Sequence, residues 1–466
     1  MTVCGPGGGA LPGARRMDRV LDTARDLGLD FFDLRIEVVP SDVLAQIAAY
    51  GLPIRAAHWS HGKVFQRMRL HGRMGLSKIF ELVINNDPAY AFYLDTNTEA
   101  DNLLLTAHVA AHSDFFKHNE LFAGTRRDMV DEAARSAARV AAYRQRYGQE
   151  RVEALMDTAF ALHRHVDLHR GPHRRPYPGR RVVMRRRPAG PYDDLAGRQD
   201  YSMSESVEGD QVPPHPERDL LWFLSRYAPL DDWERDVLGI IRHESFYFYP
   251  QFATKIINEG WACFWHVEIL QQHADLTPAE TLEVMRLHAA VVAPGPGLSV
   301  NPYYLGFKIL QDVERRLGRE HLFALRSAED DFSLIRNYLT GELCRELNLF
   351  AYGPGCSLHP VPDQRCPNCR HIRLESRSAG KVRDALLAPR YNYGVPRIVV
   401  VDTARGVLTL EQQDRRQRGM DLDYATRTLQ AMQRLWQGPV RLLCAGEDGR
   451  QVTLTCSDGG VDKDYA

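Results

Sequence analysis

The chain has 466 residues, of which 44% are hydrophobic and 26% are charged, the composition of an ordinary globular protein. It carries 59 Lys and Arg against 60 Asp and Glu, and this net charge of −1 argues against binding of nucleic acid or membranes through bulk charge. No apolar run approaches the roughly 18 residues of a transmembrane helix, and the N-terminus lacks the pattern of a secretory signal. The 8 cysteines are too few for a disulfide scaffold. We therefore expect a cytoplasmic protein.

The N-terminal part is predicted to be mixed α and β. Residues 1–16 are rich in Gly and Pro, and we expect them to be flexible. Beyond them, periodicity and turn residues predict alternating helices and strands. In chain order these are a helix from Met17, a strand in FFDLRIEVV, a helix in DVLAQIAAYGL closed by Gly51, and two strands at 78–87 and 89–95.

Most of the remaining chain is predicted to be helical. Thr96–Thr98 supply capping hydroxyls before a long helix, and two amphipathic helices follow, joined at Gly148. Residues 171–218 break this pattern with an Arg-rich block followed by an acidic one, which is typical of an exposed linker or lid. Helices resume after this segment and continue to Phe350.

The predicted fold class is α+β, mainly α. We expect one large helical core domain with a mixed α/β N-terminal segment and a small α+β C-terminal domain. The expected boundaries, in order, are a flexible 1–16, a core domain at 17–351 that contains the linker 171–218, a Cys/His insertion at 352–375 and a C-terminal domain at 376–466.

Two histidines in the long helix form the first candidate site. His108 and His112 are four residues apart, so they share one helix face and can converge on one cation. Asp114 is close to them in sequence and is a candidate partner. The alternative is a pair of histidines with ordinary hydrogen-bond partners, which is the commoner reason for this spacing.

A carboxylate in a later helix strengthens the metal hypothesis. Glu259 lies in the apolar string KIINEGWACFWH, where an unpaired charge would be costly, and His266 follows two turns later. The string is similar to the segment that supplies the glutamate zinc ligand of gluzincin metallopeptidases. However, Val109 follows the first histidine, where those enzymes carry a glutamate base. The alternative for Glu259 is a buried pair with Arg or His.

Glu244 is the candidate general acid or base. It lies in RHESFYFYPQ, between a helix and a run of aromatic residues, where desolvation would raise its pKa. The alternative is a helix-terminal glutamate paired with Arg242.

A separate Cys/His pattern predicts a structural zinc site. The two pairs of ligands are spaced as C-x2-H and C-x2-C, as in small zinc knuckles that staple a loop. The expected ligands are Cys356, His359, Cys366 and Cys369. Free thiols or a redox dithiol are the alternatives.

Several blocks of the sequence, in order, resemble the stage V sporulation protein R (SpoVR) family. They include DLGLDFFDLRIEVVPSDVL, LSKIFELVINNDPAYAF, AHVAAHSDFFKHN, RHESFYFYPQ, TKIINEGWACFWH and NPYYLGFKILQDVERR. The resemblance runs from about Leu27 to Leu349 and continues more weakly to the C-terminus. The Cys356–Cys369 knuckle departs from the family pattern and looks like a subgroup insertion.

The resemblance implies a biological process and partner proteins, but it does not imply a chemical reaction. Founding members are linked to spore cortex formation, and relatives in non-sporulating bacteria accompany a kinase-associated stress system. Its components are a PrkA-type serine protein kinase and a von Willebrand factor A-like protein, which are therefore expected partners. The recurring blocks match His58, Trp59, Glu81, His108, His112, Asp114, Phe115, Phe116, Asn119, Glu244, Pro250, Gln251, Lys255, Asn258, Glu259, Gly260, Trp261, His266, Asn301, Pro302 and Asp312.

Two functions follow as hypotheses. The first is a metal-dependent hydrolase with a divalent Zn, Fe or Mn ion in the helical core. Its ligands would be His108, His112 and Glu259, assisted by His266 or Asp114, with Glu244 as acid or base. The second is a non-enzymatic regulatory or scaffold protein in which these polar residues form hydrogen-bond networks.

Overall fold

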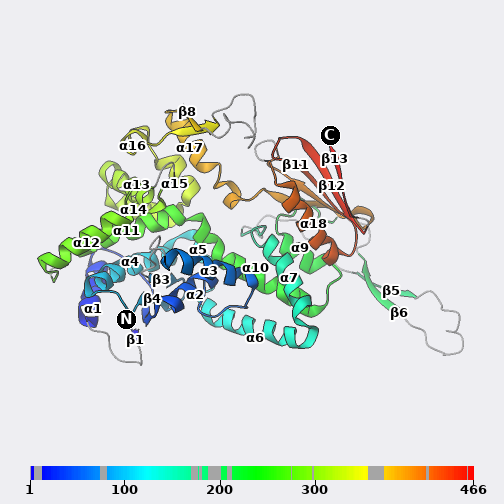
Figure 1. Cartoon of the computed structure of the whole chain (residues 1–466), viewed down its shortest axis with the longest axis horizontal. Coiled ribbons are helices and arrows are strands. Elements are labelled where there is room, and N and C mark those ends of the chain that lie inside the picture. The colour runs from blue at the N-terminus through cyan, green and yellow to red at the C-terminus, as the bar shows by residue number, and fades with distance from the viewer. Residues whose placement is uncertain are drawn as a thin grey trace. The chain divides into compact units, whose positions relative to one another are not determined.

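The computed structural model describes most of the chain (Figure 1). The described residues are 2–4, 13–73, 81–168, 177, 181–186, 201–206, 212–273, 275–295, 299–354, 372–415, 419–458 and 460–465. The predicted zinc ligands at 356–369 lie outside them, as does much of the predicted linker 171–218.

The chain forms two compact units, each built from two separate stretches. The first unit comprises Met1–Ala154 and His243–Gly394, and the second comprises Leu155–Arg242 and Val395–Ala466. We describe each unit by itself.

The first unit begins with a small mixed sheet in the order β1-β2-β4-β3. Strands β1 and β2 and strands β2 and β4 pair in parallel, whereas β3 runs antiparallel to β4, as expected for neighbours joined by a short turn. This confirms the predicted strands at 31–39 and 89–95 and, within the described residues, the one at 78–87, of which 78–80 lie outside them. The bounds are β1 (Thr2–Cys4), β2 (Leu34–Val39), β3 (Glu81–Ile84) and β4 (Ala89–Leu94).

Three helices accompany this sheet in the sequence. They are α1 (Ala14–Asp26), α2 (Ser41–Tyr50) and α3 (Trp59–Arg73). Helix α2 ends at Gly51, whose φ of 76° is a left-handed conformation that glycine adopts without strain. The predicted end of this helix is therefore confirmed.

The long central helix is α4 (Glu99–His118), and its start is fixed by a capping box. The Thr98 hydroxyl accepts a hydrogen bond from the Asp101 backbone N–H, and the Asp101 carboxylate accepts one from the Thr98 N–H. The predicted cap is confirmed. The helices that follow are α5 (Glu120–Ala123), α6 (Met129–Tyr147) and α7 (Gln149–Leu162), and Gly148 separates the last two as predicted.

The second stretch of the first unit is mainly helical. Its elements after the end of α10 (Asp232–Ala253) are α11 (Lys255–Gln272), α12 (Pro278–Val291), α13 (Pro302–Leu317), α14 (Arg319–Ala328), α15 (Asp331–Tyr338), α16 (Gly341–Glu346), β7 (Ala351–Pro354), β8 (Ile372–Ser376) and α17 (Ala379–Leu387). Strands β7 and β8 form an antiparallel pair.

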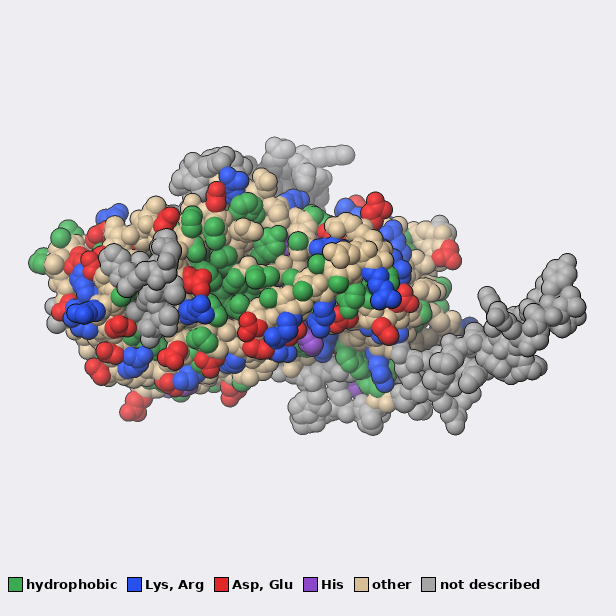
Figure 2. Space-filling model, turned by 90° about the horizontal axis from the view of Figure 1, so that it is seen from below, with side chains coloured by type: hydrophobic (Ala, Val, Ile, Leu, Met, Phe, Trp, Pro, Cys, Tyr) green, Lys and Arg blue, Asp and Glu red, His purple; other side chains and the backbone are tan. Residues whose placement is uncertain are grey.

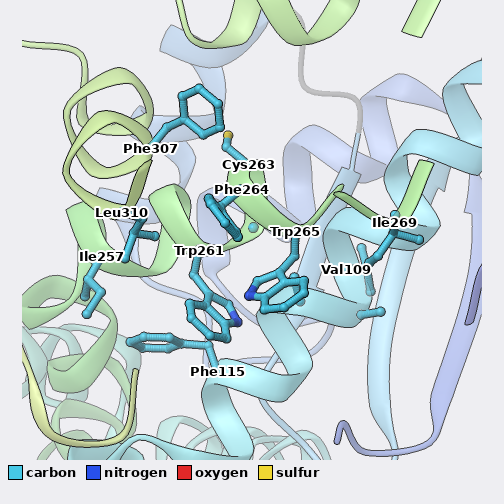
Figure 3. Packing of buried hydrophobic residues seen from close by; sticks show 14 of the residues in the cluster. Val109, Phe115, Ile257, Trp261, Cys263, Phe264, Trp265, Ile269, Phe307 and Leu310 are labelled. Atoms are coloured by element: carbon cyan, nitrogen blue, oxygen red, sulfur yellow. The ribbon is translucent and has the colours of Figure 1, made fainter. Parts of the chain in front are cut away.

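Helix α11 lies at the centre of the apolar core, packed against α4 and α13. Trp261 and Trp265 are fully buried, and Figure 3 shows them close to Phe115 of α4. A Cβ atom on Gly260 would lie only 2.4 Å from the carbonyl carbon of Gly306, so α11 and α13 can pack this closely only because both residues are glycines.

The second unit contains a five-stranded sheet in the order β13-β12-β11-β10-β9. Strands β10 and β11 are parallel and are connected through α18, while the other neighbours are antiparallel. The bounds are α9 (Leu220–Tyr227), β9 (Ile398–Asp402), β10 (Leu408–Gln412), α18 (Leu422–Trp436), β11 (Val440–Ala445), β12 (Gln451–Ser457) and β13 (Gly460–Tyr465), with a hairpin of β5 (Arg181–Arg186) and β6 (Tyr201–Ser206).

These elements confirm the predicted fold class, α+β and mainly α. In the part of the chain that the structure describes, no helix has the length and apolar character needed to cross a membrane. On the face drawn in Figure 2, acidic and basic side chains are interspersed.

Candidate metal centre

Helices α4 and α11 bring together four of the residues predicted for the metal site. His108 and His112 come from α4, and Glu259 and His266 come from α11. All four side chains are buried, at 1–7% exposure. Residues four apart on each helix face the same way, so two packed helices suffice to concentrate these side chains.

Three of the side chains converge on one point. The Nε2 atoms of His108 and His112 are 3.1 Å apart, and His112 Nε2 is 3.4 Å from Oε2 of Glu259. One ligand atom from each of these residues lies within 4.8 Å of the other two. Two ligands of a tetrahedral metal, each about 2.0–2.1 Å from it, are roughly 3.3 Å apart. The spacing of these three residues therefore fits one metal ion.

The charge states of two ligands suit a cation. Burial, followed by the charge of His112, lowers the pKa of His108 to about 3, so its imidazole is neutral and has a lone pair to donate. Burial alone would raise the pKa of Glu259, but Lys255 and His112 outweigh it and lower this pKa below its usual range. Glu259 is thus an ionised carboxylate in an apolar environment.

His112 is held by groups on both of its ring nitrogens. Burial tends to lower its pKa, but the hydrogen bond and charge of Glu259 outweigh burial, and the pKa is raised. Its Nδ1 is 2.9 Å from Oδ1 of Asn258. Because an amide oxygen only accepts, Nδ1 must donate, which leaves Nε2 of the neutral ring free for a cation.

A second carboxylate, Glu81, lies beside the three ligands. It opens β3, and its Oε1 is 3.9 Å from Nε2 of His108. Burial raises its pKa to about 7, and the neighbouring carboxylate of Glu259 adds to this shift. Its side chain keeps 21% exposure, so this edge of the site is the more accessible one.

His266 contacts the opposite edge of the His108 ring. Its Nδ1 is 2.9 Å from Nδ1 of His108, the nitrogen that faces away from His112. Its Nε2 is 2.7 Å from Nδ1 of His288 on α12. His266 therefore contacts His108, but it does not belong to the set of three ligand atoms formed by His108, His112 and Glu259.

Asp114 lies in a different cluster from the histidines. It follows His112 by two residues, a turn of about 200° around the helix. Its carboxylate accepts hydrogen bonds from Arg326 Nη1 (2.7 Å) and Trp261 Nε1 (3.0 Å). Burial raises the pKa of Asp114, although the Arg326 charge opposes that shift. It forms a structural ion pair within the core.

Glu244 pairs with Arg55, which is far away in the sequence. Its Oε2 accepts hydrogen bonds from Nε (2.7 Å) and pairs with Nη2 (2.6 Å) of Arg55. Arg242, the partner considered from the sequence, instead pairs with Asp219. Within the described part of the chain, no hydrogen bond or ion pair connects Glu244 to the histidine cluster.

Three residues at the site had no assigned role in the sequence analysis. Glu81, Cys263 and His288 surround the histidines, and Cys263 forms a second close group with His108 and His266. A signal for Cys263 was available, because it falls on the same face of α11 as Glu259 and His266. Glu81 and His288 come from other elements, so no local spacing connects them to this site, although Glu81 is among the residues that match the family's recurring blocks.

Comparison with known proteins identifies the family. A family model described as SpoVR like protein matches residues 14–361. The chain is also 32% identical over 386 residues to "Uncharacterized protein YcgB" of Escherichia coli (strain K12), covering 72% of each chain. No solved structure matches. Since the family model covers most of the chain and the central helices with the histidine cluster, the chain belongs to the SpoVR family.

Proposed function

We propose that the protein is a metal-dependent enzyme of hydrolase type. One divalent ion, Zn, Fe or Mn, would be held by His108, His112 and Glu259. The proposal is supported by one observation above all, the convergence of these three ligand atoms within 4.8 Å between two buried helices. Two imidazoles and one carboxylate are a common ligand set for catalytic zinc and for non-haem iron.

The residues around the ligands would supply the remaining chemistry. A bound metal of this kind acidifies water and polarises a substrate oxygen. Glu81, whose pKa is raised to about 7 by burial, can accept and return a proton near neutral pH. Glu81 thus takes the role that the sequence analysis gave to Glu244.

Lys255 orients the carboxylate ligand. Its ammonium group contacts Oε1 of Glu259, while Oε2 faces His112. The Lys255 side chain is 55% exposed and also lies over the Tyr303 ring, 5.6 Å from its centroid. This half-open edge, with Glu81, would admit a substrate.

Metal content tests the proposal. We expect the purified protein to contain a bound divalent metal ion. His112→Ala and Glu259→Gln should each lower the metal content by about one equivalent per chain. His118→Ala is the matched control, because His118 lies on the same helix but binds Asp30 at the surface. Metal content unchanged in both His112→Ala and Glu259→Gln would refute the proposal.

A non-enzymatic role is the second candidate, supported by a specific observation. The rings of His112, His108, His266 and His288 form a continuous hydrogen-bonded chain, with contacts of 3.1, 2.9 and 2.7 Å. Such a network can satisfy buried polar groups without an ion. In this case the protein would act as a regulator or scaffold, and none of the cluster variants would change its metal content.

The proposed biological setting rests on family resemblance alone. It links the protein to spore cortex formation or, in bacteria that do not sporulate, to a stress system. The proposed partners are a PrkA-type serine protein kinase and a von Willebrand factor A-like protein. Co-purification of either partner with the tagged full chain would support this setting, and their failure to bind would oppose it.

A further inference from the structure

The second group of ligand atoms lies on the far side of the His108 ring. It consists of His108, Cys263 and His266, whose ligand atoms all lie within 4.8 Å of one another. All three side chains are buried, and Cys263 is fully inaccessible. On α11, Glu259, Cys263 and His266 are spaced by four and three residues, so one helix face contributes to both groups.

We propose that this group binds a second metal ion, a zinc, and that the imidazole of His108 bridges the two ions. The inference rests on the proposed first ion at His108, His112 and Glu259. The two ring nitrogens of His108 already face the two groups. Nε2 is 3.1 Å from His112 Nε2, and Nδ1 is 2.9 Å from His266 Nδ1.

The donor types favour zinc at the second position. One thiolate and two imidazoles form a set typical of zinc, whereas Mg, Ca and Mn prefer oxygen ligands. Three protein donors leave one tetrahedral position for water or substrate. Figure 3 shows Cys263 next to Phe307, so the sulfur lies in apolar surroundings that strengthen its interaction with a cation.

A hydrogen bond orients the His266 ring for this role. When Nδ1 of His266 binds an ion, its Nε2 carries a proton and donates it to Nδ1 of His288 at 2.7 Å. The His288 ring is itself packed edge-on against Phe307, with the centroids 5.0 Å apart. Outer partners of this kind fix the orientation of metal-bound imidazoles.

Charge balance is also possible with two ions. Two divalent cations bring four positive charges into a buried site, which must be neutralised. The available anions are the carboxylates of Glu259 and Glu81, the thiolate of Cys263 and the bridging imidazolate of His108. Filling the second position releases two protons to solvent, one from the Cys263 thiol and one from the remaining ring N–H of His108.

Metal stoichiometry of matched variants of the full chain tests the bridge. The protein is stripped with a chelator, reloaded with Zn²⁺, desalted and analysed for bound zinc relative to the unmodified chain. We expect Cys263→Ser and His266→Gln each to lose one equivalent, His112→Ala to lose the other, and His108→Ala to lose two. Cys344→Ser is the control and should lose none, because Cys344 is a buried free cysteine of α16 outside both groups.

The outcomes separate this inference from the proposed function. Full zinc content in Cys263→Ser and His266→Gln, with one equivalent lost in His112→Ala, would overturn the second ion and leave the first intact. Full content in His112→Ala would overturn both the bridge and the proposed function. If His108→Ala fails to fold, as judged by circular dichroism, the Cys263 and His266 variants still decide the question.

Discussion

The α4–α11 pair in the first unit and strand β12 with helix α18 in the second unit place their polar side chains differently. Strand β12 alternates half-buried and buried residues along its whole length, and α18 buries one stripe that contains Leu429 and Met432. Helices α4 and α11 are buried on nearly all sides and carry His108, His112 and Glu259 inside. Burying such groups costs free energy unless they are paired.

This difference distinguishes buried residues that stabilise the fold from buried residues whose desolvation costs free energy. Strand β12 and helix α18 follow the usual pattern of a sheet covered on one face, with apolar side chains buried and polar ones outside. Helices α4 and α11 instead bury several titratable groups, among them His108, Asp114 and Glu259. Buried titratable groups with shifted pKa values are common at functional sites, so α4 and α11 are the elements in which we place the function.

The strongest test of this contrast concerns the buried ion pair of Asp114 and Arg326. Arg326→Leu would leave the Asp114 carboxylate buried without its cation, so we expect a loss of about 3–5 kcal/mol in the free energy of unfolding. Urea titration followed by tryptophan fluorescence measures it. The control is Arg126→Leu, which removes an exposed pair with Asp128 and should cost less than about 1 kcal/mol. Equal losses in the two variants would contradict the account.

In the second unit, we expect the largest loss of stability when a buried apolar residue of the sheet is truncated. Leu454 is fully buried in β12, and Leu454→Ala is expected to cost about 2–5 kcal/mol because it leaves a cavity. Thr453→Ala, on the opposite face of the same strand, should change stability by no more than about 0.5 kcal/mol. Thermal or urea unfolding compares them. A larger loss at Thr453 would show that the strand's faces are misassigned.

A substitution that disturbs the close packing of α11 against α13 should cause a smaller loss of stability than the two changes above. Gly260→Ala would force a methyl group into the Gly306 backbone, and we expect a loss of about 1–3 kcal/mol. Gly239→Ala in α10 is the matched control. Its added methyl group meets nothing within 4 Å, so helix propensity predicts a gain of roughly 0.5–1 kcal/mol. Effects of the same sign in both variants would contradict this packing.

We expect a surface ion pair to contribute least to the free energy of unfolding, and we expect its contribution to depend on pH. Arg16 holds the Glu280 carboxylate with contacts of 2.7 and 3.0 Å and lowers the pKa of Glu280 to about 2. Its folded-state pKa lies below the unfolded value, so its contribution is present above about pH 4.5 and is lost as the pH falls toward 2.

Partial exposure limits this contribution to less than about 1 kcal/mol. Arg16→Gln is expected to flatten the acid limb of the stability curve between pH 4.5 and 2, as measured by urea unfolding at several pH values. Arg25→Gln, which removes an exposed pair with Asp22, serves as the control. A steeper acid limb in Arg16→Gln would refute the assignment.

Local patterns in the sequence were enough to predict much of the fold. The Thr98 cap, the Gly51 stop and the β3–β4 turn depend on neighbouring residues, and each was predicted correctly. The association of 155–242 with 395–466 depends instead on distant contacts such as the bridge between Glu217 and Val400. Spacing rules carry no information about such contacts.

For the candidate site too, the sequence predicted the local features but not the contacts between distant segments. Helical spacing predicted that His108 and His112 share a face, and the apolar context of Glu259 predicted that it needs a partner. Asp114, a candidate partner in the sequence, lies away from the two histidines, because two residues turn a helix side chain by about 200°. The Arg55–Glu244 pair and the approach of Glu81 could not be predicted, since both depend on chain segments far apart in the sequence.

Anomalous diffraction from crystals of the full chain tests the central claim most directly. Data collected at the absorption edges of zinc, iron and manganese would locate any ion and identify it. We predict an anomalous peak about 2.0–2.2 Å from Nε2 of His108, Nε2 of His112 and a carboxylate oxygen of Glu259. A clear map without a peak between these three residues, in crystals grown with the metal present, would contradict it.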